Sequence, residues 1–415
     1  TICDENVEAV DFDTPADLVG ISFMTALAPR ARELVAAFRR HGKIVVAGGY
    51  HPTLCPEETA AYVDAVVVGE AEELWPQLLR DAAAGHLQRC YRHRQPIDPA
   101  RIPPPRRDLM RGRERYYATV NAVQTGRGCV HGCQYCSVTA FHHHTYHHRP
   151  IAAVIAELRQ LPHGFIFVDD NIIADRDYAA ALFRAMIPLR QTWVSQCSIK
   201  IADDPELLAL ARRAGCRGLF IGIETLSPAN LSGVGKEFNR AESYPERIRK
   251  IRQRGIGVIA GIIVGMDADT PEVFAAMLSF LQRTRIDAVQ VNIMTPLPGT
   301  PLFAAFEAAG RIASSDWSRY DFRHVVMTPA QMTTGQLQDG ADWLYASFYR
   351  LDRILYRFVR ALFELGPVPA WLSLKLNLTY RYDNRREGIR GHNPAGVART
   401  RPAVAGITAP EGRRI

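Results

Sequence analysis

The chain has 415 residues, enough for two or three domains, and its 47% hydrophobic and 22% charged residues exclude a disordered or fibrous protein. No uninterrupted apolar run approaches the roughly 18 residues of a membrane-spanning helix, and no signal peptide opens the chain, so we expect a cytoplasmic protein. The net charge of +7 is diffuse and lies partly after Tyr380, which favours a solvated basic surface over specific nucleic-acid binding. Because the chain opens with TICD, which resembles the end of a strand, and not with Met, we expect a stretch upstream of Thr1.

The first hundred residues alternate between expected strands and helices. Short apolar runs bounded by turn residues predict buried strands at Leu18–Phe23, Lys43–Ala47 and Ala65–Val68. Apolar spacing predicts a helix over Ala31–Arg40. Gly48, Gly49 and Gly69 directly follow two of the strands, at the edge where open α/β sheets bind ligands close to the backbone. Residues 1–94 are therefore expected to form an incomplete Rossmann-type domain with a ligand site at these glycines.

A proline-rich stretch separates this domain from a longer series of strands and helices. Prolines resist both helix and sheet, so residues 95–115 are expected to be a semi-rigid linker. Six strand candidates follow, at Ala118–Gln124, Phe165–Asp169, Trp193–Ile199, Arg217–Ile223, Gly257–Val264 and Ala288–Met294. Helical stripes between them imply parallel strands with right-handed crossovers. Six strands are too few for a full barrel, so residues 116–310 predict a partial (β/α)6 barrel of the TIM type, with its active site at the carboxyl ends of the strands.

The pattern changes after residue 310. Residues 311–387 predict a mainly helical extension, in which Trp343–Leu365 is a strongly apolar helix interrupted by charged residues, mostly arginines. Core packing accounts for such a helix, but an interfacial helix at a membrane surface or a lid over a hydrophobic substrate has the same composition. Residues 388–415, rich in Gly, Pro and Arg, predict a flexible tail.

Three of the eight cysteines, Cys129, Cys133 and Cys136, crowd into eight positions with the spacing C-x3-C-x2-C. Thiolates are the usual ligands of iron–sulfur clusters, and three ligands for four irons leave one iron open to bind and reduce a substrate. Structural zinc normally needs a fourth ligand, and His131 lies awkwardly inside the loop. The spacing therefore predicts a 4Fe–4S cluster, whereas the other, scattered cysteines are expected to be buried thiols.

The spacing C-x3-C-x-aromatic-C after the first barrel strand resembles the signature of the radical S-adenosylmethionine (SAM) superfamily. The resemblance implies that the three cysteines hold the cluster, that Tyr135 packs near the adenine of SAM, and that the open iron chelates the methionine part of SAM. One-electron reduction, by a flavodoxin- or ferredoxin-type partner, would then cleave SAM to a 5′-deoxyadenosyl radical. A non-catalytic iron–sulfur electron carrier or redox sensor is the alternative.

Polar residues and glycines at the strand ends match further positions of that superfamily. The candidate SAM-binding residues are Tyr135, Asp169, Asp170, Asn171, Ser198, Lys200, Glu224, Gly261 and Asn292. Residues 169–171 stand where many members carry a Gly-Gly-Glu stretch that contacts the methionine amino group, although an acidic helix cap is the alternative. By the same resemblance, Ser198, Lys200 and Glu224 would touch the carboxylate, ribose or amino group of SAM. A surface salt bridge would account for Glu224 equally well.

Three stretches of the first domain resemble the cobalamin-binding domain that precedes the barrel in one large subgroup of the superfamily. They are GGYHPT from Gly48, PEE from Pro56 and VGEAE from Val68. Gly48, Gly49 and Gly69 would approach the cofactor. The resemblance covers only the later half of that fold; the histidine that ligates cobalt in many cobalamin proteins lies in the earlier half, and His51 is not expected to replace it. A degenerate domain that only packs against the barrel is the alternative.

If cobalamin is bound, the resemblance implies methyl transfer to a substrate carbon radical, with oxidative ring closure, as in anaerobic tetrapyrrole cyclases, as the second choice. Methylthio transfer to tRNA is less expected, because the extra cysteine set and basic RNA module of that family are not evident. The C-terminal helix adds the hypothesis of a small, hydrophobic substrate, an isoprenoid or tetrapyrrole, and of peripheral membrane contact. The five histidines between 142 and 148 are expected to be mobile and solvent-facing, with no catalytic metal.

Overall fold

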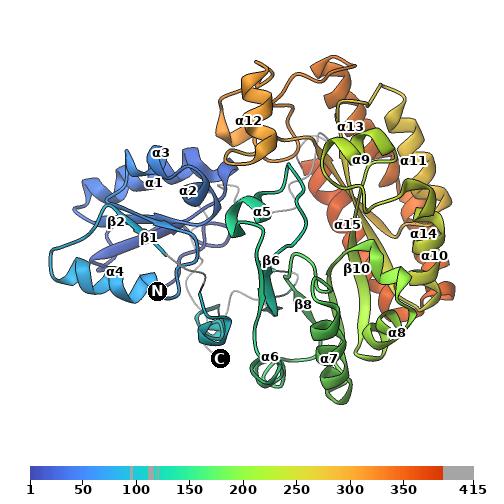
Figure 1. Ribbon diagram of the computed structural model, residues 1–415, viewed down its shortest axis with the longest axis horizontal. Coiled ribbons are helices and arrows are strands. Elements are labelled where there is room, and N and C mark those ends of the chain that lie inside the picture. Colours follow the sequence, from blue (N-terminus) through green and yellow to red (C-terminus); the bar gives the residue numbers. More distant parts are fainter. Residues whose placement is uncertain (94–96, 111–115, 118, 120, 387–415) are drawn as a thin grey trace, which may run out of the picture.

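The computed structural model describes residues 1–386 apart from 94–96, 111–115, 118 and 120; of residues 383–386 it describes only the backbone. The segment 388–415, expected to be a flexible tail, lies outside the described part of the chain. Two parallel sheets, each flanked by helices, are followed by a helical C-terminal part (Figure 1). Short 3-10 helices connect the elements at Thr25–Leu27, Pro99–Arg101, Arg107–Met110, Ile187–Leu189, Ile199–Asp203, Ala241–Ser243 and Trp317–Arg319.

The N-terminal domain has a four-stranded parallel sheet in the order β1 (Leu18–Ser22), β2 (Ile44–Gly48), β3 (Ala65–Val68) and β4 (Cys90–Arg92). Its helices are α1 (Ala28–Arg40), α2 (Tyr50–Leu54), α3 (Pro56–Ala60) and α4 (Leu74–Ala83). Successive strand residues point to opposite faces, so Val45 packs in the core with Phe38 of α1, whereas Val46 packs with Leu78 of α4. The three predicted strands are confirmed; the fourth has only three residues.

The second sheet contains the six predicted parallel strands, in the order β12-β11-β10-β9-β8-β5. They are β5 (Ala122–Val123), β8 (Phe165–Phe167), β9 (Trp193–Cys197), β10 (Cys216–Glu224), β11 (Gly257–Val264) and β12 (Ala288–Ile293). Neighbours along the chain are neighbours in the sheet, as right-handed βα units require. The expectation of a partial barrel with a Rossmann-type domain before it is confirmed.

Helices connect the barrel strands, and most of them cover the outside of the sheet (Figure 1). They are α6 (Ile151–Leu158), α7 (Arg176–Met186), α8 (Pro205–Arg213), α9 (Pro228–Gly233), α10 (Tyr244–Gln253), α11 (Val273–Arg283) and α12 (Pro301–Ala308). Side-chain caps start several of them: Asp204 accepts from the Leu207 amide at 2.8 Å before α8, and Thr300 accepts from the Phe303 amide at 3.2 Å before α12. These caps fix where the connections between strand and helix end.

The structure describes residues 97–110 of the predicted linker 95–115, and this part contacts the barrel. Arg107, in a 3-10 turn, pairs with Glu157 of α6 at 2.6 Å, and Glu157 is buried. After β5, the chain forms a small antiparallel ribbon of β6 (Gly126–Gly128) and β7 (Tyr146–His148), with α5 (Ser137–His142) between them. This ribbon and α5 frame the cysteine segment.

The C-terminal part consists of α13 (Thr334–Phe348), α14 (Leu351–Glu364) and α15 (Pro367–Arg386). The prediction of one helix over Trp343–Leu365 is wrong, because the chain leaves the helix at Tyr349 and Arg350. The Tyr349 hydroxyl donates to the Val289 carbonyl at 2.7 Å and accepts from the Val289 amide at 3.0 Å, which fixes this point to the start of β12. Arg350 is extended and starts a new helix. Within the described residues, no helix is both long and apolar enough to span a membrane.

Candidate active site

The three clustered cysteines lie on one loop between β6 and α5, beyond the carboxyl end of β5. Cys129, Cys133 and Cys136 are free thiols; Cys133 is buried and the other two are half-buried. The loop begins at Gly128, whose φ is +85°, and a Cβ there would lie 2.1 Å from the carbonyl oxygen of Thr145, so only glycine fits. All three cysteines line one cavity of about 200 Å³, which we call the small cavity. Three unpaired thiols around one space are a donor set suited to an iron–sulfur cluster.

Asp169 holds the base of this loop from behind. Its carboxylate accepts from the Gly126 amide at 2.7 Å, from the Thr125 amide at 3.1 Å and from the Thr125 hydroxyl at 2.5 Å. Asp169 is buried and lines neither cavity described here. Burial raises the pKa of Asp169 to about 6, although the three donors favour its ionised form. The structure therefore places Asp169 as an anchor for the strand that leads into the cysteine loop.

Glu224, at the end of β10, forms a buried group with Lys236 and Tyr135. The Lys236 ammonium donates to the Glu224 carboxylate and to the Tyr135 hydroxyl, the latter at 3.4 Å. Glu224 has a φ of +63°, and the register between β10 and β11 shifts between Gly222 and Glu224. A left-handed backbone at a residue other than glycine is strained and persists only where the surroundings enforce it. Here it turns the carboxylate towards Lys236 and the small cavity, which all three side chains line.

A buried cation, Lys236, lies beside the cysteines at the small cavity. Burial opposes the positive charge of Lys236, but Glu224 and Cys133 raise the pKa of Lys236 above its usual value. Burial raises the pKa of Cys133 to about 11, and Lys236 acts in the opposite direction. Burial also raises the pKa of Asp170 to about 6. Lys236 is thus a fixed cation beside groups that become anionic as metal ligands.

A second cavity of about 450 Å³, the barrel cavity, lies inside the curved sheet. Every barrel strand from β8 to β12 contributes to its wall. The apolar wall includes Ile166, Val194, Phe220, Ile259, Ile263, Met294 and Leu297, and the polar side chains are Gln196, Gln290 and Asn292 among others. The two cavities share Tyr135, Cys136 and Glu224 as lining residues. The cysteine loop therefore borders an apolar chamber with a few polar groups, the usual make-up of a small-molecule site.

Most of the predicted SAM-binding residues lie around these two cavities. Asp170, Asn171 and Ser198 line the small cavity, Gly261 and Asn292 line the barrel cavity, and Tyr135 and Glu224 line both. The Asn171 side chain accepts from the Ser198 amide at 3.0 Å, which joins the ends of β8 and β9. Lys200 lines neither cavity, but its ammonium lies 4.8 Å from the ring centre of Phe238, which does line the small cavity. Lys236 is a residue of this site that the sequence analysis missed.

The N-terminal domain contacts the cysteine segment directly. Arg127, two residues before Cys129, pairs with Glu70 at 2.7 Å and with Glu72 at 2.5 Å, both from the loop after β3. Burial opposes ionisation of Glu70, but the His147 ring and the Arg127 guanidinium outweigh it and lower the pKa of Glu70 to about 2. Tyr50 of α2 packs on Phe141 of α5 with ring centres 4.8 Å apart. The predicted ligand edge of the first domain therefore faces the cysteine loop.

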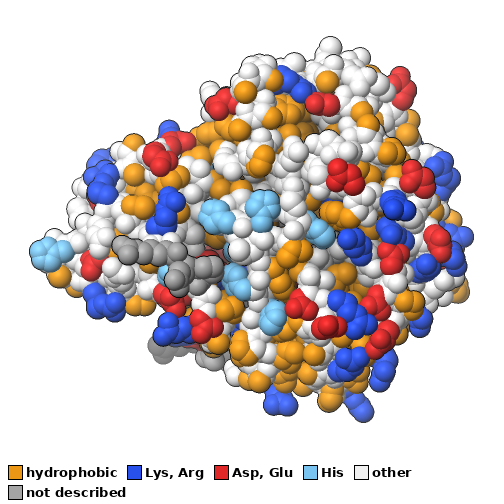
Figure 2. All heavy atoms as spheres, in the orientation of Figure 1, with side chains coloured by type: hydrophobic (Ala, Val, Ile, Leu, Met, Phe, Trp, Pro, Cys, Tyr) orange, Lys and Arg blue, Asp and Glu red, His pale blue; other side chains and the backbone are white. Residues whose placement is uncertain are grey.

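Two of the five histidines after the cysteine loop are less exposed than predicted. Figure 2 shows histidine side chains gathered on the face between the N-terminal domain and the barrel. His147 is half-buried and lies 3.4 Å from Glu70, and His148 stacks on Tyr178 with ring centres 3.9 Å apart. Burial lowers the pKa of His142 to about 4. His143, His144 and His148 are exposed, as predicted, whereas His142 and His147 are half-buried. His147 lies on β7, which pairs with β6 across this segment.

Of the three glycines predicted to approach the cofactor, Gly69 has open space beside its backbone, whereas Gly49 is packed closely. Gly69 has a φ of +84°, and a Cβ there would meet no atom within 4 Å, so a ligand could lie against the main chain. Gly49 has a φ of +96°, and a Cβ there would lie 2.8 Å from the Ser22 hydroxyl. Gly48 ends β2 beside them. His51 is fully buried, with its ring centre 5.6 Å from that of Trp317. The open backbone at Gly69 fits a bulky cofactor at this edge.

Comparison with known proteins agrees with this arrangement. Residues 123–281 match the family model of the radical SAM superfamily, and residues 4–79 match that of the B12 binding domain. The chain is 28% identical to bacteriochlorophyllide d C-12(1)-methyltransferase of Chlorobaculum tepidum, over 82% of this chain and 75% of that protein. It is 27% identical to hopanoid C-2 methylase of Rhodopseudomonas palustris, over 86% of this chain and 70% of that protein. The fold resembles that of the radical SAM methyltransferase TsrM from Kitasatospora setae, with a TM-score of 0.66, 18% identity, and coverage of 91% and 89%.

The fold and the site define a partial-barrel enzyme whose three-cysteine loop faces a Rossmann-type domain. The chain contains a radical SAM domain over residues 123–281, preceded by a B12 binding domain over residues 4–79. It is a radical SAM enzyme, and its cofactors are a 4Fe–4S cluster, SAM and cobalamin. The thiols of the small cavity and the open backbone at Gly69 are the features of this chain that fit these groups.

Proposed function

We propose that the protein transfers a methyl group from methylcobalamin to a carbon atom of a hydrophobic, ring-containing substrate held in the barrel cavity. The observation that carries this proposal is the apolar cavity of about 450 Å³ that shares Tyr135, Cys136 and Glu224 with the small cavity. An apolar chamber next to a radical-generating site excludes water and binds a greasy substrate. The names of the relatives support the substrate class, since one acts on a bacteriochlorophyllide and another on a hopanoid.

The residues of the small cavity would bind the cluster and SAM. When bound, the cluster and SAM supply a 5′-deoxyadenosyl radical, and methylcobalamin supplies the methyl group. Cys129, Cys133 and Cys136 would hold the cluster, with the Lys236 charge offsetting that of the thiolates. Asp170 and the paired Asn171 and Ser198 offer carboxylate, amide and hydroxyl groups to the amino-acid end of SAM.

The substrate would be oriented by few polar groups. Gln290 and Asn292 of β12 lie among apolar neighbours in the barrel cavity, with the Gln290 amide 3.4 Å from the Asn292 oxygen. Polar groups in an apolar pocket fix orientation, because leaving them unpaired on binding is unfavourable. The Phe220 ring packs against Gly261 of β11, since a Cβ there would lie 2.7 Å from that ring, and both residues line the barrel cavity. We expect adenine or a flat substrate ring at this wall.

The test uses the full chain, reconstituted anaerobically with iron, sulfide and methylcobalamin, and given SAM with an isotopically labelled methyl group. Bacteriochlorophyllide d and a hopanoid are the two substrates to supply, in separate reactions. We expect 5′-deoxyadenosine, S-adenosylhomocysteine and a labelled product with at least one of them. Cys133→Ala should abolish all three, whereas Cys90→Ala, which changes an exposed cysteine away from the loop, should abolish none.

Two outcomes would contradict the proposal. If 5′-deoxyadenosine forms with a substrate but no methylated product appears, labelled or unlabelled, methyl transfer is excluded and oxidative ring closure is favoured. If neither substrate stimulates deoxyadenosine formation, although SAM and methylcobalamin are bound, the proposed hydrophobic substrate class is wrong.

A further inference from the structure

Helices α14 and α15 expose an unusual number of large apolar side chains. On α14 these residues repeat along one face, and on α15 they form a second stripe. The exposed apolar residues of the two helices are Leu351, Leu355, Tyr356, Val359, Leu362 and Phe363, and Val368, Trp371, Leu372, Leu378 and Tyr382. Phe363 is 85% exposed, and Tyr356 and Trp371 are each 61% exposed. Contiguous apolar surface of this kind marks an interaction site more often than single exposed residues do.

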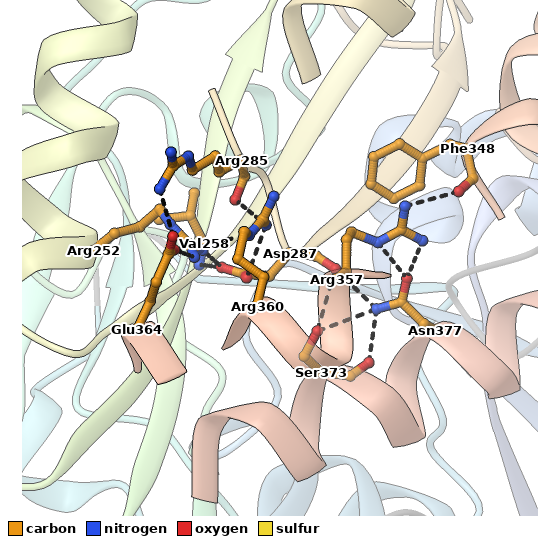
Figure 3. Close-up of polar contacts among 10 residues, drawn as sticks. All are labelled: Arg252, Val258, Arg285, Asp287, Phe348, Arg357, Arg360, Glu364, Ser373 and Asn377. Carbon is orange, nitrogen blue, oxygen red and sulfur yellow. Dashed lines mark hydrogen bonds and ion pairs between the residues drawn. The ribbon is translucent and has the colours of Figure 1, made fainter. Parts of the chain in front are cut away.

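The opposite faces of the same helices are fixed to the barrel by a buried polar network (Figure 3). Arg357 of α14 donates to Asn377 of α15 at 2.6 Å and to the Phe348 carbonyl at 2.9 Å. Asn377 in turn donates to the Asp287 carbonyl at 2.8 Å. Arg252 of α10 pairs with the Asp287 carboxylate and with Glu364 of α14. The hairpin of α14 and α15 is thus held with one face inward, so its apolar outer face is a fixed feature of the surface.

This outer face lies away from the active site. Asp287 directly precedes β12, and its carboxylate accepts from the Val258 amide at the start of β11. The network therefore joins the hairpin to the amino ends of the strands, whereas the small cavity lies at their carboxyl ends. Changes to the outer face can accordingly be separated from changes to the reaction.

The charge of this region indicates whether a second copy of the chain or a lipid surface covers the outer face. On the exposed side of the described helices, Arg350, Arg353 and Lys375 lie beside the apolar residues, and Asp352 pairs with the two arginines. Glu364 is paired with Arg252 and Arg285, so the exposed charge of this side is on balance positive. A second copy of the chain would bring the same positive face against itself, which is unfavourable. An anionic lipid surface offers both an apolar layer for Phe363 and Trp371 and negative headgroups for the basic residues.

We propose that α14 and α15 dock the protein onto an anionic lipid bilayer, with the apolar outer face lying in the interfacial layer. The helices lie on the surface and do not cross it, in agreement with the absence of a spanning helix among the described residues. The inference does not depend on the chemistry of the reaction, since the docking face and the cavities lie at different ends of the barrel.

The experiment is flotation of the full chain with vesicles of phosphatidylcholine alone and with vesicles of equal parts phosphatidylcholine and phosphatidylglycerol. We expect the protein to float with the mixed vesicles, more weakly with phosphatidylcholine alone, and less as salt is raised. Phe363→Ser combined with Trp371→Ser should lower binding to the mixed vesicles at least about tenfold, because two large apolar side chains no longer leave water. Arg353→Glu should reduce the preference for phosphatidylglycerol. Leu79→Ser, which changes an exposed apolar residue of α4, should have no effect.

Unchanged thermal unfolding and SAM cleavage would show that the variants remain folded, because the altered side chains point outward. Three results would overturn the proposal: no flotation of the wild type with the mixed vesicles, equal flotation of the wild type and the Phe363→Ser, Trp371→Ser variant, or a dimer in light scattering that this variant dissociates. The last result would assign the outer face to a second copy of the chain.

Discussion

Arg127 joins the cysteine loop to the N-terminal domain, and its removal should weaken the protein measurably. In Arg127→Met the carboxylates of Glu70 and Glu72 would face each other without their cation, and both side chains are largely shielded from water, at 11% and 22% exposure. Lowering the pKa of Glu70 from 4.5 to about 2 corresponds to about 3 kcal/mol, shared between Arg127 and His147. With a smaller part from Glu72, we expect a loss of about 2–4 kcal/mol in the free energy of unfolding at neutral pH.

The pH dependence gives this prediction a sign. Because the pKa of Glu70 is lowered in the folded protein, its stabilising contribution is present above pH 4.5 and is lost as the pH falls from 4.5 towards 2. The difference between the wild type and Arg127→Met in urea unfolding should therefore shrink over that range. Arg30→Met, which removes a more exposed arginine paired within the first domain, is the control and should change stability by about 0–1 kcal/mol. Equal unfolding of Arg127→Met and the wild type at neutral pH would refute this reasoning.

Three further changes test the site and the scaffold. Asp169→Ala removes three hydrogen bonds at the base of the cysteine loop, each worth about 1.5–3 kcal/mol to a charged acceptor, so iron and sulfide bound after reconstitution should fall; full cluster content would argue against an anchoring role. Gly215→Ala should lower the free energy of unfolding by several kcal/mol, because the φ of Gly215 is +103° and a Cβ there would lie 1.8 Å from a carbonyl oxygen. Gly42→Ala, with open space around it, should lower that free energy by only about 1 kcal/mol. Lys236→Met leaves Glu224 buried without its cation and should destabilise the fold by about 3–5 kcal/mol in urea unfolding, with partial recovery in Lys236→Arg; no loss would mean that the pair is not formed.

The strands could be predicted from the sequence because most of them are buried on both faces. A parallel strand covered by helices is a continuous apolar run, and the run Gly257–Val264 has the same bounds in the structure as in the sequence analysis. The sequence did not predict β4, because Cys90–Arg92 offers only one buried side chain, that of Tyr91. It also did not predict the break between α13 and α14, because Tyr349 ends the first helix through a contact with Val289, sixty residues away in sequence. The apolar pattern of a segment indicates burial, but it does not indicate hydrogen bonds between distant residues such as Tyr349 and Val289.

The same limit applies to the site. The cysteines could be found because their ligand spacing is local, and several polar residues at strand ends could be placed because parallel strands meet at one edge. Lys236 and Arg127 could not be assigned roles, because each pairs with carboxylates from other parts of the chain. Lys236 pairs with Glu224 at the end of β10, and Arg127 pairs with Glu70 and Glu72 after β3. Only the tertiary contacts show which carboxylates these two cations pair with.

Asp169 and Asp170 are neighbours in sequence but have different roles in the structure. Both follow β8, and the sequence treats them alike, but their carboxylates lie in different surroundings. Asp170 lines the small cavity, while Asp169 turns behind the cysteine loop and accepts from Thr125 and Gly126. An acidic pair at a strand end can thus supply one group for a ligand and another for the loop that holds the ligand's metal. The geometry of the cysteine loop therefore depends on the Asp169 carboxylate as well as on the thiols.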